Sequence, residues 1–380
     1  MPPRTKAYLN SLSIPSPALL SALKKDPRFT NPPNLSSLSY QDLRAHRAAI
    51  LREKWPLRYL PGPIPEVLER DLRIPVRNGA EITIRIYTPV NTKPGGEDES
   101  RPLIVMFHEG GWGMGDLSDE EVNCRLFSRD LGAVCVNVEY RLAPEYPFPT
   151  WIEDAWDALV WCAEHTLELG VELEKGFVVG GGSAGGNIAA VLAVRARDRG
   201  VGWKLSGQYL CVPAITCFLP PSHIPSKYRN EYLSHPLVTP SSDPILKLIP
   251  HLGPLFTPLT LFFRALLYPL PLSLLVPIYR RLGFHAPISS PLFVPFLNHS
   301  TEQGFKGLPP AYFQVCGLDP LRDEGLIYER ILREESGVET RLDVYPGVGH
   351  YFWTNFPEME GSRAFVEDSV RGVGWLLGRK

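Results

Sequence analysis

A serine in a glycine-rich turn is the first residue of this chain whose surroundings suit covalent chemistry. Ser183 is the central residue of a Gly-x-Ser-x-Gly sequence at 181–185. The apolar run Phe177–Val179 precedes it, and residues 187–194 after it have the small and apolar composition of a helix. A strand, a sharp turn and a helix in this order lift the serine to the tip of the turn, at the positive end of the helix dipole. The pattern predicts a nucleophile, against the alternative of a glycine-rich turn with an incidental serine.

A serine hydroxyl is a weak nucleophile, so it needs a base and an acid that orients the base. Asp319 comes shortly after the apolar run 311–316, and His350 follows a second strand-like run at 341–345. Both residues therefore lie at the predicted carboxyl ends of strands, where α/β sheets carry functional groups. Their chain order, serine then aspartate then histidine, is a known order for such a triad. The sequence predicts Ser183 as nucleophile, His350 as base and Asp319 as the orienting acid.

The acid and the base each have an alternative interpretation. Asp319 precedes Pro320 and is also a candidate helix N-cap, and Asp323, four residues later, is a competing acid. His350 is also a candidate for a packed loop histidine with no catalytic role. The three strand-end positions in the expected order favour the catalytic interpretation.

Glycines after a further apolar run offer a place for developing negative charge. The run 102–107 leads into His108 and then into Gly110 and Gly111. Successive glycines leave backbone N–H groups open to a ligand. The N–H groups of Gly110, Gly111 and Ala184 are expected to form an oxyanion hole for a tetrahedral intermediate. His108 is expected to hold this loop through hydrogen bonds.

These motifs together resemble those of the hormone-sensitive-lipase-like family of α/β-hydrolases, particularly its fungal branch. The resemblance spans about residues 70–375, and its matching segments are His108–Trp112, Glu139–Glu145, Pro147–Pro149, Gly181–Asn187, Leu308–Pro310, Asp319–Gly325 and Tyr345–His350. It implies the roles of nucleophile, base, acid and oxyanion donors for Ser183, His350, Asp319, Gly110, Gly111 and Ala184.

Three residues depart from the pattern of this family. Glu109 stands where the family usually has glycine, and its carboxylate is expected to contact a polar substrate or to perturb His350. Gly182 replaces an acidic residue before the nucleophile, and Tyr351 replaces a glycine after the histidine. None of these changes removes a catalytic group, but they alter the expected shape of the substrate site.

Composition excludes several other classes of protein. The 380 residues include 39 Lys and Arg against 41 Asp and Glu, a net charge of −2, so there is no basic excess for nucleic acid. The sequence has no phosphate-binding GxxxxGK[ST] motif and no pair of CxxC motifs, and no cofactor or metal is expected. Six scattered cysteines indicate buried thiols. The first residues lack the apolar core of a signal peptide, which predicts a cytoplasmic enzyme.

The order of the predicted elements indicates an α/β protein. Strands are expected at residues 72–76, 81–87, 102–107, 133–138, 177–180, 208–213, 311–316 and 341–345. Helices are expected between several of them, at residues 120–131, 151–165, 187–199 and 322–335. This alternation predicts an eight-stranded, mostly parallel sheet covered by helices on both faces, which is the α/β-hydrolase fold with a helical cap.

The cap is expected to come from two segments. Residues 1–68 form the first, residues 69–215 and 301–380 form the catalytic domain, and residues 216–300 form a cap insertion. The middle of the insertion, residues 245–278, is apolar but interrupted too often by proline to span a membrane. It is expected to form short helices that pack on the catalytic domain. An overlapping alternative is a lid that admits lipophilic substrates or rests on a membrane surface.

The sequence therefore predicts a serine hydrolase that cleaves carboxylic esters of hydrophobic small molecules, with water as the second reactant. One alternative keeps the triad but acts on a polyketide-like intermediate, by product release, acyl transfer or C–C cleavage. Another alternative is a small-molecule receptor, because the family that this chain resembles includes a plant receptor. That receptor lacks the base histidine, whereas His350 is present here. The ester and the oligomeric state are not predicted.

Overall fold

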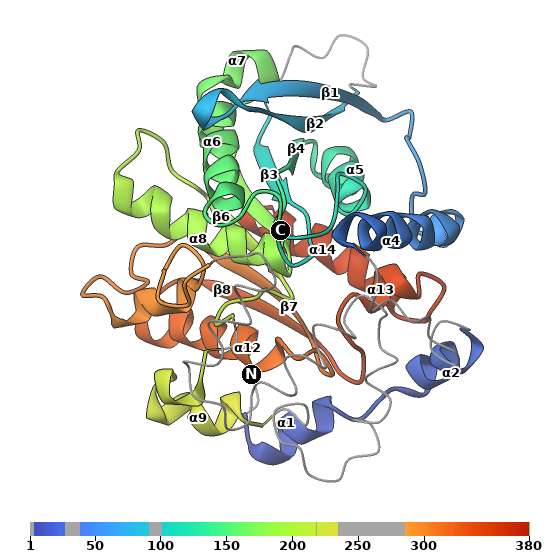
Figure 1. The fold of residues 1–380 in the computed structure, drawn as a ribbon, viewed down its shortest axis with the longest axis vertical. Helices are drawn as coiled ribbons and strands as arrows, with labels where there is room; N and C mark the ends of the chain where they lie inside the picture. Colours follow the sequence, from blue (N-terminus) through green and yellow to red (C-terminus); the bar gives the residue numbers. More distant parts are fainter. Residues whose placement is uncertain (1–3, 27–38, 91–100, 218, 235–285, 380) are drawn as a thin grey trace.

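One mixed sheet forms the centre of the molecule. The computed structural model describes residues 4–26, 39–90, 101–217, 219–234 and 286–379. Its eight strands have the order β1-β2-β4-β3-β5-β6-β7-β8 (Figure 1). They are β1 Val67–Pro75, β2 Glu81–Pro89, β3 Leu103–Phe107, β4 Val134–Glu139, β5 Phe177–Gly182, β6 Gly207–Cys211, β7 Ala311–Cys316 and β8 Thr340–Tyr345. β2 is antiparallel to β1 and to β4, and the other neighbouring pairs are parallel.

Helices cover the sheet and extend beyond it. The main helices of the described residues are α1 Lys6–Leu12, α2 Pro17–Lys25, α4 Tyr40–Lys54, α5 Glu121–Leu131, α6 Thr150–Glu164, α8 Ala184–Arg199, α9 Ser226–Tyr232, α12 Arg322–Arg330, α13 Phe352–Asn355 and α14 Ser362–Leu376. The predicted helix at 322–335 is α12 followed by a π-helical turn at Ile331–Glu335.

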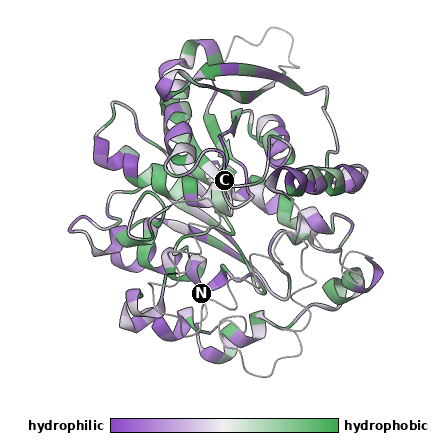
Figure 2. Cartoon of the chain, in the orientation of Figure 1, coloured by the Kyte–Doolittle hydropathy of each residue, from purple (hydrophilic) through white to green (hydrophobic). Residues whose placement is uncertain are grey.

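The central strand β3 is apolar throughout because it is buried on both faces. In β3, Val105 and Phe107 belong to the core that includes α6, α8 and α12, whereas Ile104 and Met106 belong to the core that includes α5 and α14. Successive side chains of a strand point to opposite faces, so a strand between two helical layers has no side that faces solvent. Figure 2 shows hydrophobic strands at the centre and hydrophilic residues on the outer sides of the helices.

The sequence predicts the eight strands closely, and the largest difference is at the edge of the sheet. β1 begins at Val67, five positions before the expected start. Most of its side chains are exposed or half-buried, so they lack the apolar pattern that marks the inner strands. Backbone pairing extends the strand, since Val67 lies opposite Pro89 of β2.

The N-terminal residues lie against loops from the other end of the chain. The backbone N–H of Gly347 donates to Leu12 O at 2.9 Å, and that of Ser16 donates to Gly347 O at 2.9 Å. Further along, α4 contacts the short helix α13 (Figure 1). These contacts attach the segment before β1 to the loop that follows β8.

The predicted lid, residues 245–278, lies outside the described residues, and its role stays a prediction. Within the part of the chain that the structure describes, no helix is long and apolar enough to cross a membrane. All six cysteines are buried and have free thiols.

Candidate active site

Ser183 lies between β5 and α8 in a conformation that a serine rarely adopts. Its backbone φ is 52° and its ψ is −109°, which is a strained combination for a residue with a side chain. Hydrogen bonds hold it in place, because its N–H donates to Cys211 O at 2.9 Å and its carbonyl accepts from Asn187 N at 2.9 Å. The serine is thus at the tip of the turn, as the sequence predicts.

The turn around Ser183 packs directly on the end of β3. A Cβ atom at Gly185 would lie 1.9 Å from Phe107 O, and one at Gly181 would lie 2.2 Å from the same oxygen. No side chain fits into either space, so glycine is required on both sides of the serine. The close approach brings the serine turn to the point where the loop with Gly110 and Gly111 begins.

That loop is held by the buried residue His108. Its Nδ1 lies 2.7 Å from Glu109 O, and since a carbonyl oxygen only accepts, Nδ1 is the protonated donor. The ring stacks on Tyr140 with centroids 4.1 Å apart, and the Tyr140 hydroxyl donates to His108 O at 2.8 Å. Burial lowers the pKa of His108, so the ring is neutral and structural. These contacts agree with the loop-holding role predicted for it.

The predicted acid and base lie together. His350 Nδ1 is 2.6 Å from Asp319 Oδ2, and both side chains are buried. The other oxygen of Asp319 accepts the N–H of Leu321 at 2.8 Å. Leu321, and not Asp319, is the N-cap residue of α12, so the alternative of a helix cap at Asp319 is wrong. Asp323, the competing acid, pairs with Arg322 at 2.7 Å. The geometry therefore places Asp319 against the histidine.

The loops that carry Ser183 and His350 meet through their neighbours Gly182 and Tyr351. A Cβ atom at Gly182 would lie 1.8 Å from the Tyr351 hydroxyl oxygen. The ring of Tyr351 also packs edge-on against His350, with centroids 4.7 Å apart. In the sequence, Gly182 and Tyr351 are two separate departures from the family pattern. In the structure they are one contact, because the phenol occupies the space that the glycine leaves.

We expect Gly182→Ala to lower kcat for an ester substrate by about 10- to 100-fold, because the added methyl group displaces residues beside both Ser183 and His350. In Tyr351→Phe the nearest remaining atom of the ring, Cζ, lies 3.0 Å from that methyl position. The double variant Gly182→Ala/Tyr351→Phe should therefore recover most of the lost kcat, while Tyr351→Phe alone stays close to the wild type. Steady-state kinetics of the four proteins measure this. Equal kcat in the single Gly182 variant and the double variant would contradict the contact.

Glu120, which the sequence analysis did not single out, is buried beside the same glycine. Its Oε1 lies 3.5 Å from the Cβ position of Gly182, and its Oε2 accepts a 2.7 Å hydrogen bond from Asn123. Burial raises the pKa of Glu120 to about 7, although the bond from Asn123 acts to lower it. Its position just before α5 gives no sign of this burial, because charged residues are common at helix starts.

We expect Glu120→Gln to change how stability depends on pH. The pKa of the carboxyl group is about 7 in the folded protein against an ordinary value of 4.5. Burial of the ionised Glu120 therefore does not lower the free energy of unfolding below pH 4.5. The loss increases from pH 4.5 to pH 7 and reaches its full size above pH 7. The variant should gain up to about 3 kcal/mol over the wild type between pH 5 and pH 8. Urea unfolding at both pH values measures this, with the exposed Glu302→Gln as control. Parallel pH dependences in Glu120→Gln and the wild type would refute the assignment.

Glu109 makes a contact that the sequence could not indicate. The sequence analysis expects its carboxylate to meet a polar substrate or to perturb His350. Its Oε1 instead accepts a hydrogen bond of 2.7 Å from Arg47 Nη2 of α4, and both side chains are buried.

Comparison with known proteins places the chain in a family. Residues 104–246 and 275–354 match the model of a family described as having the alpha/beta hydrolase fold. The chain belongs to this α/β-hydrolase family. An AB hydrolase superfamily protein of Schizosaccharomyces pombe is 35% identical to this α/β-hydrolase, and the match covers 95% of this chain and 93% of that protein. The versiconal hemiacetal acetate esterase of Dothistroma septosporum is 31% identical over 78% of each chain.

Solved structures agree with this assignment. Vibralactone cyclase superposes on this α/β-hydrolase with a TM-score of 0.74 at 27% identity, covering 97% of this chain and 96% of its own. The family match and the esterase relative confirm the predicted resemblance and the predicted fold class.

Proposed function

We propose that this α/β-hydrolase cleaves carboxylic esters of hydrophobic small molecules through an acyl-enzyme on Ser183. The observation that carries the proposal is the 2.6 Å contact between His350 Nδ1 and Asp319 Oδ2, on loops after β8 and β7. A histidine held by a carboxylate at Nδ1 is fixed in the tautomer whose Nε2 accepts a proton. Ser183 lies between β5 and α8, on a strained turn of the kind that carries a nucleophile.

In the proposed reaction, Ser183 Oγ attacks the ester carbonyl carbon while His350 Nε2 takes the hydroxyl proton. Asp319 keeps the imidazole oriented and stabilises its positive charge. The N–H groups of Gly110, Gly111 and Ala184 bind the oxyanion of the tetrahedral intermediate. His350 then returns the proton to the leaving alcohol, and water attacks the acyl-enzyme by the same route to release the acid.

The named relatives support a small ester as substrate. The Dothistroma protein is named as the esterase of an acetate, which favours a short acyl group in the substrate of this α/β-hydrolase. The aromatic ring of Tyr351 packs edge-on against His350, and an apolar surface next to the base favours an apolar substrate over a charged one.

A second candidate function has the structural similarity to vibralactone cyclase in its favour. An acyl-enzyme on Ser183 can be attacked by a hydroxyl group of its own acyl chain in place of water. The product is then a lactone, and no acid is released. This reaction needs the same residues in the same roles, and only the acceptor differs.

The test uses p-nitrophenyl acetate, butyrate and longer esters with the wild type and Ser183→Ala. We expect release of p-nitrophenol by the wild type and none above background by the variant. A p-nitrophenyl ester with a hydroxyl on its acyl chain separates the two candidates, because mass spectrometry distinguishes the acid from the lactone. A wild type that releases no p-nitrophenol and whose Ser183 does not react with a fluorophosphonate would refute both.

A further inference from the structure

Helix α4 contacts the loop of the proposed oxyanion hole through its arginines. The helix begins with a capping box in which Ser39 and Asp42 hold each other's backbone N–H groups. From this fixed start, Arg44 Nε donates to Gly113 O at 2.8 Å and Arg44 Nη2 donates to Ala143 O at 2.7 Å. One helix of the N-terminal segment thus holds the glycine loop after β3.

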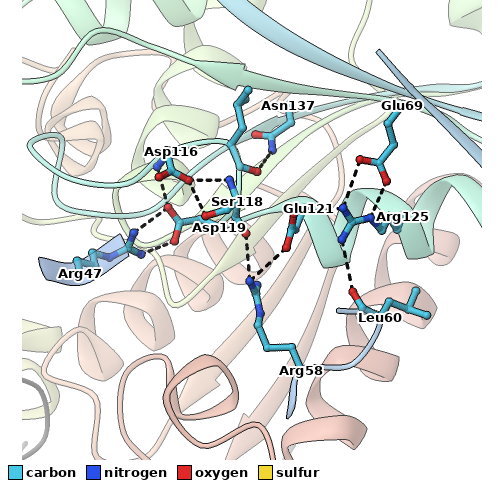
Figure 3. Close-up of polar contacts among 11 residues, drawn as sticks. Arg47, Arg58, Leu60, Glu69, Asp116, Ser118, Asp119, Glu121, Arg125 and Asn137 are labelled. Atoms are coloured by element: carbon cyan, nitrogen blue, oxygen red, sulfur yellow. Dashed lines mark hydrogen bonds and ion pairs between the residues drawn. The ribbon is translucent and has the colours of Figure 1, made fainter. Parts of the chain in front are cut away.

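Arg47, one turn later on α4, is buried between two carboxylates of that region. Its Nη2 donates to Glu109 Oε1 at 2.7 Å, and its Nη1 donates to Asp119 Oδ2 at 3.0 Å. Asp119 in turn accepts the backbone N–H of Asp116 at 2.9 Å, as Figure 3 shows. Arg47 therefore joins the start of the glycine loop to the turn at 116–119.

The charges make Arg47 hard to replace. Burial raises the pKa of Glu109 well above its ordinary value, and the nearby Asp119 acts in the same direction, whereas Arg47 opposes both effects. Without the guanidinium group, two buried carboxylates would face each other with no cation between them. The loop would have to move or bind a proton.

The peptide unit between Glu109 and Gly110 connects this ion pair to the reaction. Its carbonyl oxygen is the acceptor of the 2.7 Å hydrogen bond from His108 Nδ1, and its N–H is that of Gly110, a proposed oxyanion donor. The side chain that precedes this peptide is held by Arg47. The direction of the Gly110 N–H is thus fixed at two points, by His108 on the carbonyl and by Arg47 on the side chain.

We infer that Arg47 is a positioning residue for the oxyanion hole, acting through Glu109 on the N–H of Gly110. This inference rests on the proposed function for the role of that N–H group. Glu109, which stands where a glycine is usual, is the attachment point of α4, and the N-terminal segment is thereby part of the apparatus that stabilises the transition state.

Arg47→Met tests the inference, with Arg52→Met as the matched control. Arg52 lies on the same helix but is exposed. Oxyanion donors act mainly in the transition state, so Arg47→Met should lower kcat for p-nitrophenyl butyrate by about 10- to 100-fold and leave KM within about threefold. The Ki of an alkyl trifluoromethyl ketone, which mimics the tetrahedral intermediate, should rise by the same factor as kcat/KM falls. Arg52→Met should match the wild type in all three constants.

A second variant covers the case in which Arg47→Met does not fold. Glu109→Ala breaks the link to the loop but keeps the pair between Arg47 and Asp119, and it should give the same losses. Combining the two substitutions should cost no more than either alone, because both remove one link. Folded variants with kcat and Ki within twofold of the wild type would overturn the inference.

The rate at which a fluorophosphonate labels Ser183 separates this inference from the proposed function. Labelling depends on the nucleophile and the oxyanion hole whatever the natural substrate is. Slower labelling in Arg47→Met and Glu109→Ala, with a wild type that hydrolyses no ester, would keep the inference and reject the substrate class. Unchanged labelling in both variants, with an active wild type, would reject the inference alone.

Discussion

Ser183→Ala, His350→Ala and Asp319→Asn should each lower kcat for ester hydrolysis by about 10³- to 10⁶-fold, and combining them should cost little more. In the proposed mechanism the three residues act as one unit, so removing any of them stops proton transfer to or from the serine. The Asp319 variant is the most informative of the three. It keeps the shape of the side chain but lets its amide face His350 Nδ1, which favours the wrong tautomer. The measurements are kcat and KM with p-nitrophenyl butyrate. Circular dichroism first checks that each variant is folded.

Asp323→Asn is the matched control, since it makes the same chemical change four residues along the chain. The carboxylate of Asp323 accepts hydrogen bonds from Arg322 and Ser234, so its loss should lower the Tm more than kcat. Should folded Asp323→Asn lose as much kcat as Asp319→Asn, the orienting acid has been misidentified.

Gly185→Ala should abolish most activity by a different route. The added methyl group would lie 1.9 Å from Phe107 O and 3.0 Å from His108 O. Both contacts are with backbone atoms, which cannot rotate away as the tip of a side chain can. Either the serine turn or the glycine loop must therefore shift by about 1 Å, and a misplacement of that size costs about 10²-fold in rate for each group that moves. We expect kcat to fall by about 10³-fold or more.

Gly202→Ala controls for the general effect of replacing a glycine, because its new Cβ would meet nothing within 4 Å. It should change neither kcat nor the Tm measurably. A folded Gly185→Ala protein with wild-type kcat would show that the turn and the loop are not in the close contact described.

The elements that the sequence predicts well are those marked by local patterns. The continuous apolar run of β3 indicates a strand buried on both faces, and the glycines of residues 181–185 indicate a sharp turn. The positions of Ser183, Asp319 and His350 at strand ends follow from such runs. Each of these signals lies within a few neighbouring residues.

The contacts that the sequence could not indicate join residues far apart in the chain. Arg47 and Glu109 are separated by 62 positions, and α4 carries other arginines that look alike in the sequence. Tyr351 fills the space of Gly182 only because the loops after β5 and β8 meet in three dimensions. One sequence contains no information on such pairing, so Glu109, Gly182 and Tyr351 stand out as unusual residues without indicating their partners.

The placement of the first helix has a consequence for how the protein is made. Leu12 O binds the N–H of Gly347, and Arg322 donates to Leu9 O at 2.9 Å and to Ser13 Oγ at 2.6 Å. The residues of α1 are synthesised before these partners, since Arg322 follows Ser13 by 309 positions. The apolar side chains of α1 therefore remain exposed to solvent until these partners have been synthesised. The loop of His350 likewise lacks the contacts of Gly347 with residues 12–16 until both segments have been synthesised, so the proposed catalytic residues are assembled only after that point.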